Sequence, residues 1–264
     1  MQAWVESIGL YAPGLAGWNA GREVLAGRAA YDNAPLPKYK PALLPPNERR
    51  RATNSVRIAF GACEDAVGEN LSEAARLAAV FASSGGDYGV HDQICRALMR
   101  EEIAVSPTHF HNSVHNAAAG YWSIATGAHA PSVSLSAHDS SVAAGLLEAL
   151  PLVALEQLST LLVFSDCEVV ATMHSKRPVD DPFACALWLT PGPTPRSLAS
   201  VQVNASCTEG VESTCANSEL ERLRCNNPAA RVLPLLELLA LEQGGTVVIQ
   251  GSSGQPVAVT VQIE

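Results

Sequence analysis

The residues best suited to chemistry lie in the stretch Ser136-Ala-His-Asp-Ser-Ser141. Before it, Val133 and Leu135 alternate with serines, which predicts a strand, and after it small and then apolar residues at helical spacing predict a helix to Leu150. A strand, a tight turn and a helix form a nucleophile elbow, because the helix points its first free N–H groups at the turn. The residue at the tip is His138, so the sequence predicts a site scaffold without a Cys or Ser nucleophile.

A second group is rich in histidine: His109, His111 and His115, with His138 and Asp139 as further ligands if the fold brings them close. Histidines at i and i+2 on an extended segment point the same way, and neutral imidazoles with a carboxylate can bind zinc or iron. The alternative, which we favour, is that these histidines cap helices and satisfy backbone groups in a loop. We therefore predict no bound metal and no other cofactor.

The seven cysteines are scattered and contain no CxxC pair, which indicates neither a disulfide framework nor a zinc ribbon and fits a reducing cytosol. Cys167 follows a predicted strand between Asp166 and Glu168, and neighbouring carboxylates raise a thiol pKa, which opposes nucleophilic reactivity. Three others lie in apolar patterns typical of core positions: Cys63, Cys95 and Cys185. A serine hydrolase is not indicated, because there is no GxSxG.

The composition, with 47% hydrophobic and 16% charged residues in 264, is that of a globular protein. A net charge of −9 argues against nucleic acid or an anionic membrane surface as the main partner. An acidic carrier protein could still bind a local basic patch such as Arg49-Arg-Arg51, although a solvated helix start is the simpler interpretation. No apolar stretch is long enough to span a bilayer, and we expect a cytoplasmic protein.

Strand-length apolar runs alternate with helical patterns along the whole chain. The predicted strands are Trp4–Leu10, Leu77–Ala82, Thr160–Phe164, Phe183–Leu189 and a hairpin of Thr246–Gln250 with Val257–Ile263. The predicted helices are Val56–Val67, Val90–Glu101 with Ile94, Ala97 and Leu98 inward, one from Ala117, and Val232–Leu241. Five prolines make residues 31–48 an irregular loop, and residues 191–228 show no clear pattern. This order indicates an α/β fold with helices on both faces of the sheet.

Several motifs, taken in order, resemble the β-ketoacyl synthases of thiolase fold, and most closely the short chain-length-factor-like members of aryl polyene biosynthesis. Glu48-Arg-Arg-Arg51 is similar to the family's arginine-rich helix start, and Val80 to Asp87 is similar to its glycine-bearing strand end. Ser136 to Ser141 matches the position where an active ketosynthase has Thr-Ala-Cys-x-Ser-Ser. The resemblance runs nearly end to end. It implies a truncated thiolase-like fold of layered sheets, with residues 1–264 as one ketosynthase-like domain whose C-terminal half is shortened.

This sequence departs from the family's catalytic pattern in two ways. Condensation needs a thiolate to hold the acyl chain, and two later histidines to help decarboxylate malonyl and stabilise the oxyanion. His138 stands at the cysteine position, where imidazole forms no lasting thioester equivalent, and only His174 follows it. The resemblance therefore implies a subunit without activity of its own. Its partner would be an active ketosynthase, in a heterodimer that elongates aryl polyene or polyketide-type chains on a transiently bound acyl carrier protein.

The resemblance also implies which residues carry this role. The candidates for lining the acyl tunnel or pocket are Phe110, His111, His115, Asn116, His138 and Asp139. The candidates for the dimer interface are Ala118, Gly120, Val133 and Leu135. His138 could instead only fill the vestigial pocket. Two further functions stay open: a residual decarboxylase for malonyl carrier protein that uses His138 or His111, and a hydrolase with a metal at the histidine cluster.

Overall fold

The computed structural model describes residues 1–205 and 210–263. Its strands, in chain order, are β1 (Gln2–Ala12), β2 (Leu15–Ala16), β3 (Ala78–Ala82), β4 (Ser132–Leu135), β5 (Thr160–Asp166), β6 (Phe183–Thr190), β7 (Ala199–Asn204), β8 (Gly245–Gln250) and β9 (Pro256–Ile263). Its α-helices are α1 (Trp18–Leu25), α2 (Pro46–Arg51), α3 (Asn54–Val67), α4 (Leu71–Ala74), α5 (Tyr88–Leu98), α6 (Pro107–Asn112), α7 (Ala117–Thr126), α8 (Ser141–Ala154), α9 (Ala171–His174), α10 (Ser218–Asn226) and α11 (Leu233–Ala240). Three short 3-10 helices are η1 (His138–Ser140), η2 (Pro228–Val232) and η3 (Ser252–Gly254).

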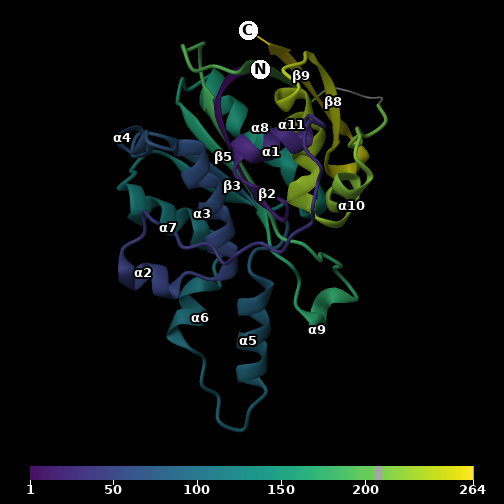
Figure 1. Cartoon of the computed structure of the whole chain (residues 1–264). Helices are drawn as coiled ribbons and strands as arrows, with labels where there is room; N and C mark the ends of the chain where they lie inside the picture. The colour runs from purple at the N-terminus through teal and green to yellow at the C-terminus, as the bar shows by residue number, and fades with distance from the viewer. Residues whose placement is uncertain (206–209, 264) are drawn as a thin grey trace.

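The strands form one mixed sheet in the order β4-β3-β5-β6-β1-β7-β9-β8, with β2 paired to β1 (Figure 1). Strands β4, β3 and β5 are parallel to one another, and the remaining pairs are antiparallel. The central strands β5 and β6 are buried along their whole length, which explains their unbroken apolar runs. β4 lies at one end of the strand order, so only one of its edges is paired within the chain.

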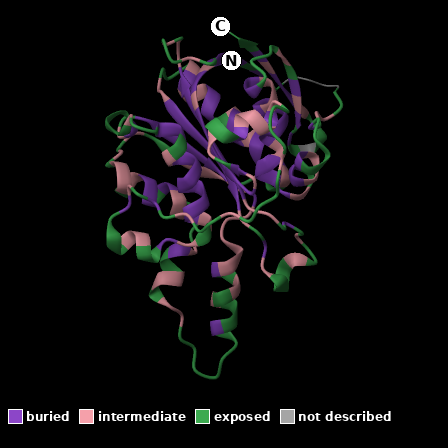
Figure 2. Cartoon of the chain, in the orientation of Figure 1, coloured by how far each residue is buried: buried purple, intermediate pink, exposed green. Residues whose placement is uncertain are grey.

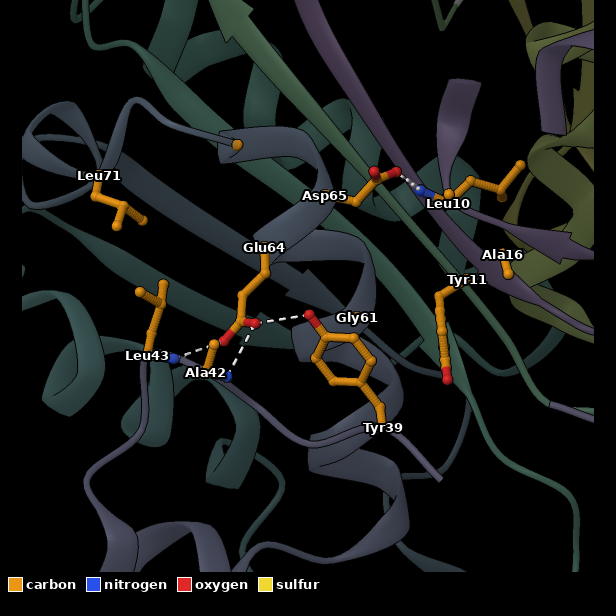
Figure 3. A pocket seen from close by; sticks show the side chains of 12 residues that line it. Leu10, Tyr11, Ala16, Tyr39, Ala42, Leu43, Gly61, Glu64, Asp65 and Leu71 are labelled. Carbon is orange, nitrogen blue, oxygen red and sulfur yellow. Dashed lines mark hydrogen bonds between the residues drawn. The ribbon is translucent and has the colours of Figure 1, made fainter. Parts of the chain in front are cut away.

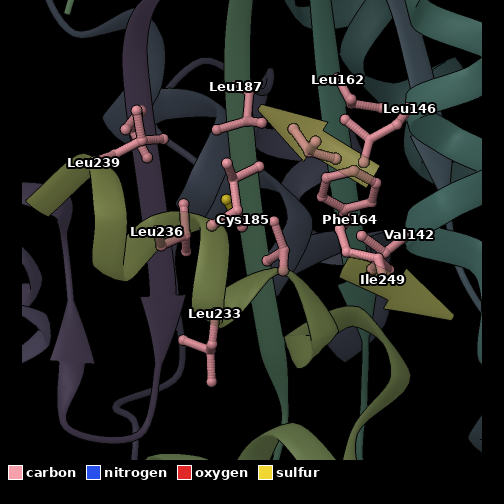
Figure 4. Close-up of a cluster of buried hydrophobic side chains, with 14 of the residues drawn as sticks. Val142, Leu146, Leu162, Phe164, Cys185, Leu187, Leu233, Leu236, Leu239 and Ile249 are labelled. Carbon is pink, nitrogen blue, oxygen red and sulfur yellow. The ribbon is translucent and has the colours of Figure 1, made fainter. Parts of the chain in front are cut away.

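Helices cover both faces of this sheet. On one face, α8 and α11 pack with strand residues in a large apolar cluster that includes Val142, Phe164, Leu236 and Ile249 (Figure 4). On the other face, α3 and α7 bury Phe60 and Trp122 in an edge-to-face contact with ring centroids 5.6 Å apart. Buried residues are therefore concentrated in and around the sheet, as Figure 2 shows. The predicted α/β class, with helices on both faces, is confirmed.

Most predicted elements are present with shifted ends. The opening strand, the two central strands, the terminal hairpin and the helix around Cys63 are confirmed, and Cys63 is buried. The irregular loop ends where α2 begins at Pro46, because proline fits the first turn of a helix. In residues 191–228, where the sequence shows no pattern, the structure contains β7 and α10. No helix among the described residues is long and apolar enough to cross a membrane.

The helices α5 and α6, with the loop between them, project from the body of the protein as an arm (Figure 1). We call residues 88–116 the α5–α6 arm. Ala97 is buried as predicted, but Leu98 is 52% exposed, so the prediction that it faces inward is wrong. Cys95 is also exposed rather than part of a core. The helical period is correct, but the arm has too little neighbouring structure to bury a full apolar face.

Candidate functional site

The elbow predicted from the sequence is present: β4 leads through Ala137 and η1 into α8. His138 at its tip has φ 52°, in the left-handed region that non-glycine residues rarely adopt. The Ser141 hydroxyl donates to the His138 carbonyl at 2.8 Å and accepts from the Ala137 N–H at 3.0 Å. A strained residue persists only where its surroundings hold it, and here Ser141 holds it from both sides.

The side chain of His138 points away from the core and is 70% exposed. Its Nδ1 lies 3.3 Å from the Asp139 carboxylate and 3.4 Å from Nη1 of Arg177. His174, the only later histidine, bonds Asp180 through Nε2 at 2.7 Å. His138 therefore has a carboxylate and a guanidinium for neighbours, and His174 is paired elsewhere.

Asp139 is fixed by two arginines from distant parts of the chain. Arg177 donates to its Oδ1, and Nη2 of Arg231 lies 3.3 Å from Oδ2. Arg231 also donates through Nη1 to the Asp139 carbonyl at 2.9 Å and to Oε1 of Gln250, in β8, at 3.1 Å. Partial burial opposes the charge of Asp139, but the bond to Arg177 and the two positive charges outweigh it and lower its pKa. The carboxylate is thus occupied as a structural ion pair.

Behind the elbow lies a second carboxylate, Asp166, at the end of β5. It is buried, and its Oδ1 accepts from the Ser84 N–H at 2.8 Å, the Ser84 hydroxyl at 2.9 Å and the Ser83 hydroxyl at 3.1 Å. Burial raises the pKa of Asp166 to about 6, against the opposing effect of these bonds and of the Arg177 charge. The positive charge of Arg177 therefore acts to lower the pKa of both Asp139 and Asp166.

The six tunnel candidates do not line one pocket. His138 and Asp139 lie together at the elbow, and His115 reaches its strand through a 2.9 Å bond between Nε2 and the Leu135 carbonyl. Phe110 and His111 lie on the α5–α6 arm, where Phe110 is 71% exposed and His111 packs edge-on against Tyr121. Asn116 is exposed at the start of α7. Their roles stay predictions.

A small cavity separates α7 from the ends of β3 and β5. His115, Ala117 and Ala118 contribute to its lining, and its volume is about 30 Å³. Such a volume holds about one or two water molecules and is far below the several hundred Å³ that a ligand of drug size needs. An acyl chain therefore does not fit between these residues within the chain alone.

The four interface candidates lie at one end of the molecule. Val133 and Leu135 are half-buried in β4, the terminal strand of the sheet, and pack against the core beside α8. Ala118 is half-buried in α7, whereas a Cβ atom added at Gly120 would meet no atom of the described chain within 4 Å. The surface over Gly120 is thus open to close approach by another backbone.

The spacing argument for a metal site is wrong, because His109 and His111 lie on α6 and not on an extended segment. Pro107 at the first position starts this helix, and residues two apart on a helix point in different directions. Among the residues that the structure describes, no group of three His, Cys, Asp or Glu side chains could hold a metal ion.

The cysteines give no sign of a nucleophile. The pKa of Cys167 is raised by burial and by Glu168, Asp87 and Asp166, in the predicted direction. The six cysteines within the described ranges are free thiols. The seventh, Cys207, lies outside the described residues.

A further cavity beside the sheet contains none of the predicted site residues. It has a volume of about 440 Å³ and lies between α3, β1 and the irregular loop (Figure 3). The Glu64 carboxylate accepts from the Tyr39 hydroxyl at 2.6 Å and from the N–H groups of Ala42 and Leu43, both at 3.0 Å. Asp65 accepts from the N–H groups of Leu10 and Trp18. Both carboxylates therefore hold the loop and the first turn of α1 in place.

A comparison with models of protein families identifies the family to which this chain belongs. The family model described as β-ketoacyl synthase, N-terminal domain, matches residues 18–231. The chain belongs to the β-ketoacyl synthase family. No curated protein sequence matches it. The family assignment agrees with the elbow, since β4, η1 and α8 provide the strand, turn and helix at the expected place.

Solved structures of the family share the whole fold. A structure of the ketosynthase ApeO in complex with its chain length factor ApeC, from Xenorhabdus doucetiae, matches with 24% identity and a TM-score of 0.71, over 99% of each chain. The AntDE:AntF complex, a type II polyketide acyl-carrier protein with its ketosynthase bound to the hexaketide, matches with 13% identity and a TM-score of 0.74, over 100% of this chain and 99% of that one. A β-ketoacyl synthase from Burkholderia phymatum STM815 matches with 12% identity and a TM-score of 0.67 over the same shares. These likenesses confirm the ketosynthase-like fold.

Sequence reasoning located the elbow but missed Arg177 and Arg231. Arg177 lies in a polar loop and Arg231 follows a proline-alanine stretch. Neither position has a local sequence pattern that indicates a functional role. Their association with Asp139 depends on contacts across 38 and 92 positions of the chain. The one indication in the sequence is the charge of Asp139 beside His138, because a carboxylate at such a site needs a positively charged partner.

Proposed function

We propose that the chain is a non-catalytic partner subunit of an active β-ketoacyl synthase, of the chain-length-factor kind. The observation that carries this proposal is the elbow itself: it keeps the strained backbone of a nucleophile site, but holds His138 at the tip and a paired Asp139 beside it. Neither group can carry an acyl chain as a thioester. The likeness to a complex of a ketosynthase with its chain length factor supports this assignment.

We also propose that the chain is a single ketosynthase-like domain. The match to the N-terminal domain of the family covers residues 18–231, and residues 232–263 follow it. These residues form α11, β8, η3 and β9, which complete the apolar cluster against α8. This shared core supports one domain.

The partner would bind at the end of the sheet marked by β4 and α7, next to the α5–α6 arm. β4 offers an unpaired edge, α7 offers the open surface over Gly120, and the arm exposes Met99, Ile103 and Phe110. Exposed large apolar side chains and an open strand edge are each typical of a protein interface. Because no cavity within the chain holds an acyl group here, the tunnel would lie between the two subunits, with a carrier protein delivering the chain.

Co-expression with an active ketosynthase of the same source, with a tag on this chain alone, tests the proposal. We expect a stable one-to-one complex by size-exclusion chromatography. Gly120→Glu should abolish the complex while the chain stays folded, because it places a charge on the open surface of α7. Gly192→Glu is the matched control, since a Cβ there also meets no atom of the described chain within 4 Å. A monomer or homodimer that ignores the ketosynthase would rule the proposal out.

A residual decarboxylase activity is the second candidate. It is favoured by the 3.4 Å approach of Arg177 to His138, which places a positive charge and an imidazole at one exposed spot. Such a pair could stabilise the enolate formed when malonyl carrier protein loses carbon dioxide. Release of carbon dioxide by the isolated chain, lost in His138→Ala, would establish this activity.

A further inference from the structure

The 30 Å³ cavity behind α7 has an unusual set of polar atoms. It lies where the start of α3, the ends of β3 and β5, the start of α5 and the end of α6 come together. Its polar lining comes from both acceptors and hydroxyl groups: Thr53, Ser55, Ser83, Asp87, Asn112 and Ser165. A space of this size holds an occupant no larger than one or two water molecules.

Asn112 lines this space and has a side-chain oxygen atom without a hydrogen-bond partner in the described part of the chain. The residue is 2% exposed, and its Nδ2 donates to the carbonyls of Thr108 at 2.8 Å and Arg51 at 3.3 Å. These two bonds fix which end of the amide is the nitrogen, because a carbonyl can only accept. The remaining Oδ1 is buried and has no partner among the described residues. Such an acceptor normally finds a donor or a cation.

Asp87 contributes a second oxygen of the same kind. Its Oδ1 caps α5 by accepting from the Val90 N–H at 2.9 Å, while Oδ2 is buried without a partner in the described chain. Lys and Arg do not occur among the described residues that line the cavity, and the exposed His115 bonds the Leu135 carbonyl. A carboxylate oxygen buried without a counter-charge is costly, so its charge calls for a cation.

We propose that this cavity binds one dehydrated monovalent cation of the size of K⁺ or NH₄⁺. Asp87 Oδ2 and Asn112 Oδ1 are its principal ligands, and hydroxyl oxygens of the lining serines and threonine complete the oxygen environment that hard cations prefer. Water could donate to both acceptors but would leave the charge of Asp87 unbalanced. A single carboxylate is too little charge for a divalent ion, in agreement with the lack of a three-residue metal cluster in the described ranges.

The cation would fix the α5–α6 arm to the body, because Asp87 caps the start of α5 and Asn112 belongs to α6, while the hydroxyl groups lie at the start of α3 and at the ends of β3 and β5. This inference does not rest on the proposed partner role. It concerns the isolated chain, so every test below is made without a ketosynthase, and its failure would leave the partner assignment unaffected.

The first test is the melting temperature of the full chain in chlorides of K⁺, NH₄⁺, Na⁺, Li⁺ and choline at equal ionic strength, after exhaustive dialysis into choline chloride. We expect the melting temperature in K⁺ or NH₄⁺ to exceed that in choline by about 3–6 °C when the cation is at ten times its Kd. K⁺ and NH₄⁺ measured separately show which of the two ions binds more tightly.

Two variants of the same helix localise the effect. Asp87→Asn keeps an oxygen to cap α5 but replaces the charged ligand, so the difference between K⁺ and choline should vanish, and the melting temperature in choline should equal or exceed that of the native chain because an uncompensated charge is removed. Asp92→Asn makes the same chemical change outside the cavity, where Asp92 pairs with Arg96 and Thr172, and should keep the cation effect.

A third variant tests the competing explanation that Asn112 is satisfied by Tyr121. The Tyr121 hydroxyl lies close enough to the Asn112 side chain for that side chain to lower the Tyr121 pKa, although burial raises the pKa overall and no hydrogen bond of good geometry satisfies the hydroxyl among the described residues. Tyr121→Phe should leave the cation effect intact. If it behaves like Asp87→Asn, the hydroxyl and not a cation completes the site.

Crystals grown in RbCl give a direct measurement that needs no variant. We expect one anomalous peak in the cavity, coordinated by Asp87 Oδ2 and Asn112 Oδ1. Equal melting temperatures in all five salts, together with density that carries no anomalous signal, would show that the cavity contains water only and would overturn the proposal.

Discussion

The elbow and the α5–α6 arm differ in whether their side chains find partners within the chain. At the elbow, Asp139 is paired with arginines from two distant segments, and the strained backbone of His138 is held by Ser141. The arm is mostly exposed in Figure 2, and its large apolar side chains Met99 and Phe110 are exposed to solvent. The charged group at the elbow is therefore paired within the chain, whereas the apolar side chains of the arm are not covered by it. This contrast agrees with a subunit that has lost chemistry and kept an interface.

The largest effect on the elbow should come from Arg231→Met. The change keeps the bulk of a largely buried side chain but removes its bonds to the Asp139 carbonyl, the Asp139 carboxylate and Gln250. We expect the free energy of unfolding to fall by about 1–3 kcal/mol, because Arg231 is largely buried while its partner Asp139 is 39% exposed and keeps its bond to Arg177. Denaturant unfolding measures it.

The matched control for that experiment is Arg222→Met. Arg222 is 40% exposed and its ion pairs with Asp181 and Glu219 lie at 3.5 and 3.4 Å. Exposed pairs of this kind contribute about 0–1 kcal/mol. If the two variants lose the same amount, the elbow is no more firmly fixed than the surface, and the contrast with the arm fails.

A second test of the elbow uses the pH dependence of stability through Asp166. Its pKa of about 6 in the folded protein lies above the usual value of 3.8, so the folded state holds the proton more tightly than the unfolded state. The free energy of unfolding therefore falls as pH rises from about 4 to about 6, and stays lower above that range. Asp166→Asn removes this group while its oxygen can still accept from Ser83 and Ser84.

Relative to the native chain, Asp166→Asn should gain about 2 kcal/mol between pH 4 and pH 7, less than the full shift corresponds to because the unfolded carboxyl is already partly ionised at pH 4. Calorimetry across this range measures the difference. Asp92→Asn is the control: the bond to Arg96 lowers the pKa of Asp92 below its usual 3.8, so its effect on stability is confined to pH values of about 4 and below, and this variant should show no comparable gain between pH 4 and pH 7. A flat difference for Asp166→Asn would show that this carboxyl is not the source.

Phe110→Glu should weaken binding of the ketosynthase partner through the arm without destabilising the fold. Phe110 is 71% exposed, so a charged side chain there should change the free energy of unfolding by no more than about 0.5 kcal/mol. Its affinity for the ketosynthase partner should fall at least about tenfold, or about 1.4 kcal/mol, if the arm contacts that partner. Leu155→Glu, at a side chain 72% exposed beyond the end of α8, is the control and should bind normally. Equal binding by both variants would remove the arm from the interface.

The fold was predictable where local pattern and burial agree. The runs that form β3, β5 and β6 are apolar because both sheet faces are covered, and the prolines of residues 31–48 left no doubt about an irregular segment. The elbow was predictable for a similar reason, since the change from alternating to helical spacing falls at Ala137. In each case the signal lies within one short window.

The features that the sequence did not predict depend on contacts between residues far apart in the chain, which no short sequence window contains. Leu98 fits a helical stripe but projects beyond the body that could bury it. His109 and His111 looked paired only if extended, and Pro107 starts a helix there instead. Arg177, Arg231 and the lining of the small cavity are assembled from segments far apart in the chain, so their grouping requires the tertiary structure.

The smallest intervention compares two thiols, one from each region. Cys95 is exposed on the arm, whereas Cys167 follows β5 behind the elbow, where burial and then Glu168, Asp87 and Asp166 raise its pKa. Because the thiolate is the reactive form, iodoacetamide at pH 8 should modify Cys95 at least about tenfold faster than Cys167, as measured by peptide mass spectrometry of the folded chain. In denaturant the two rates should converge, since both causes of the difference are features of the folded state. Equal rates in the folded chain would mean that the region behind the elbow is as open as the arm, and that the separation between a completed site and an exposed interface does not hold.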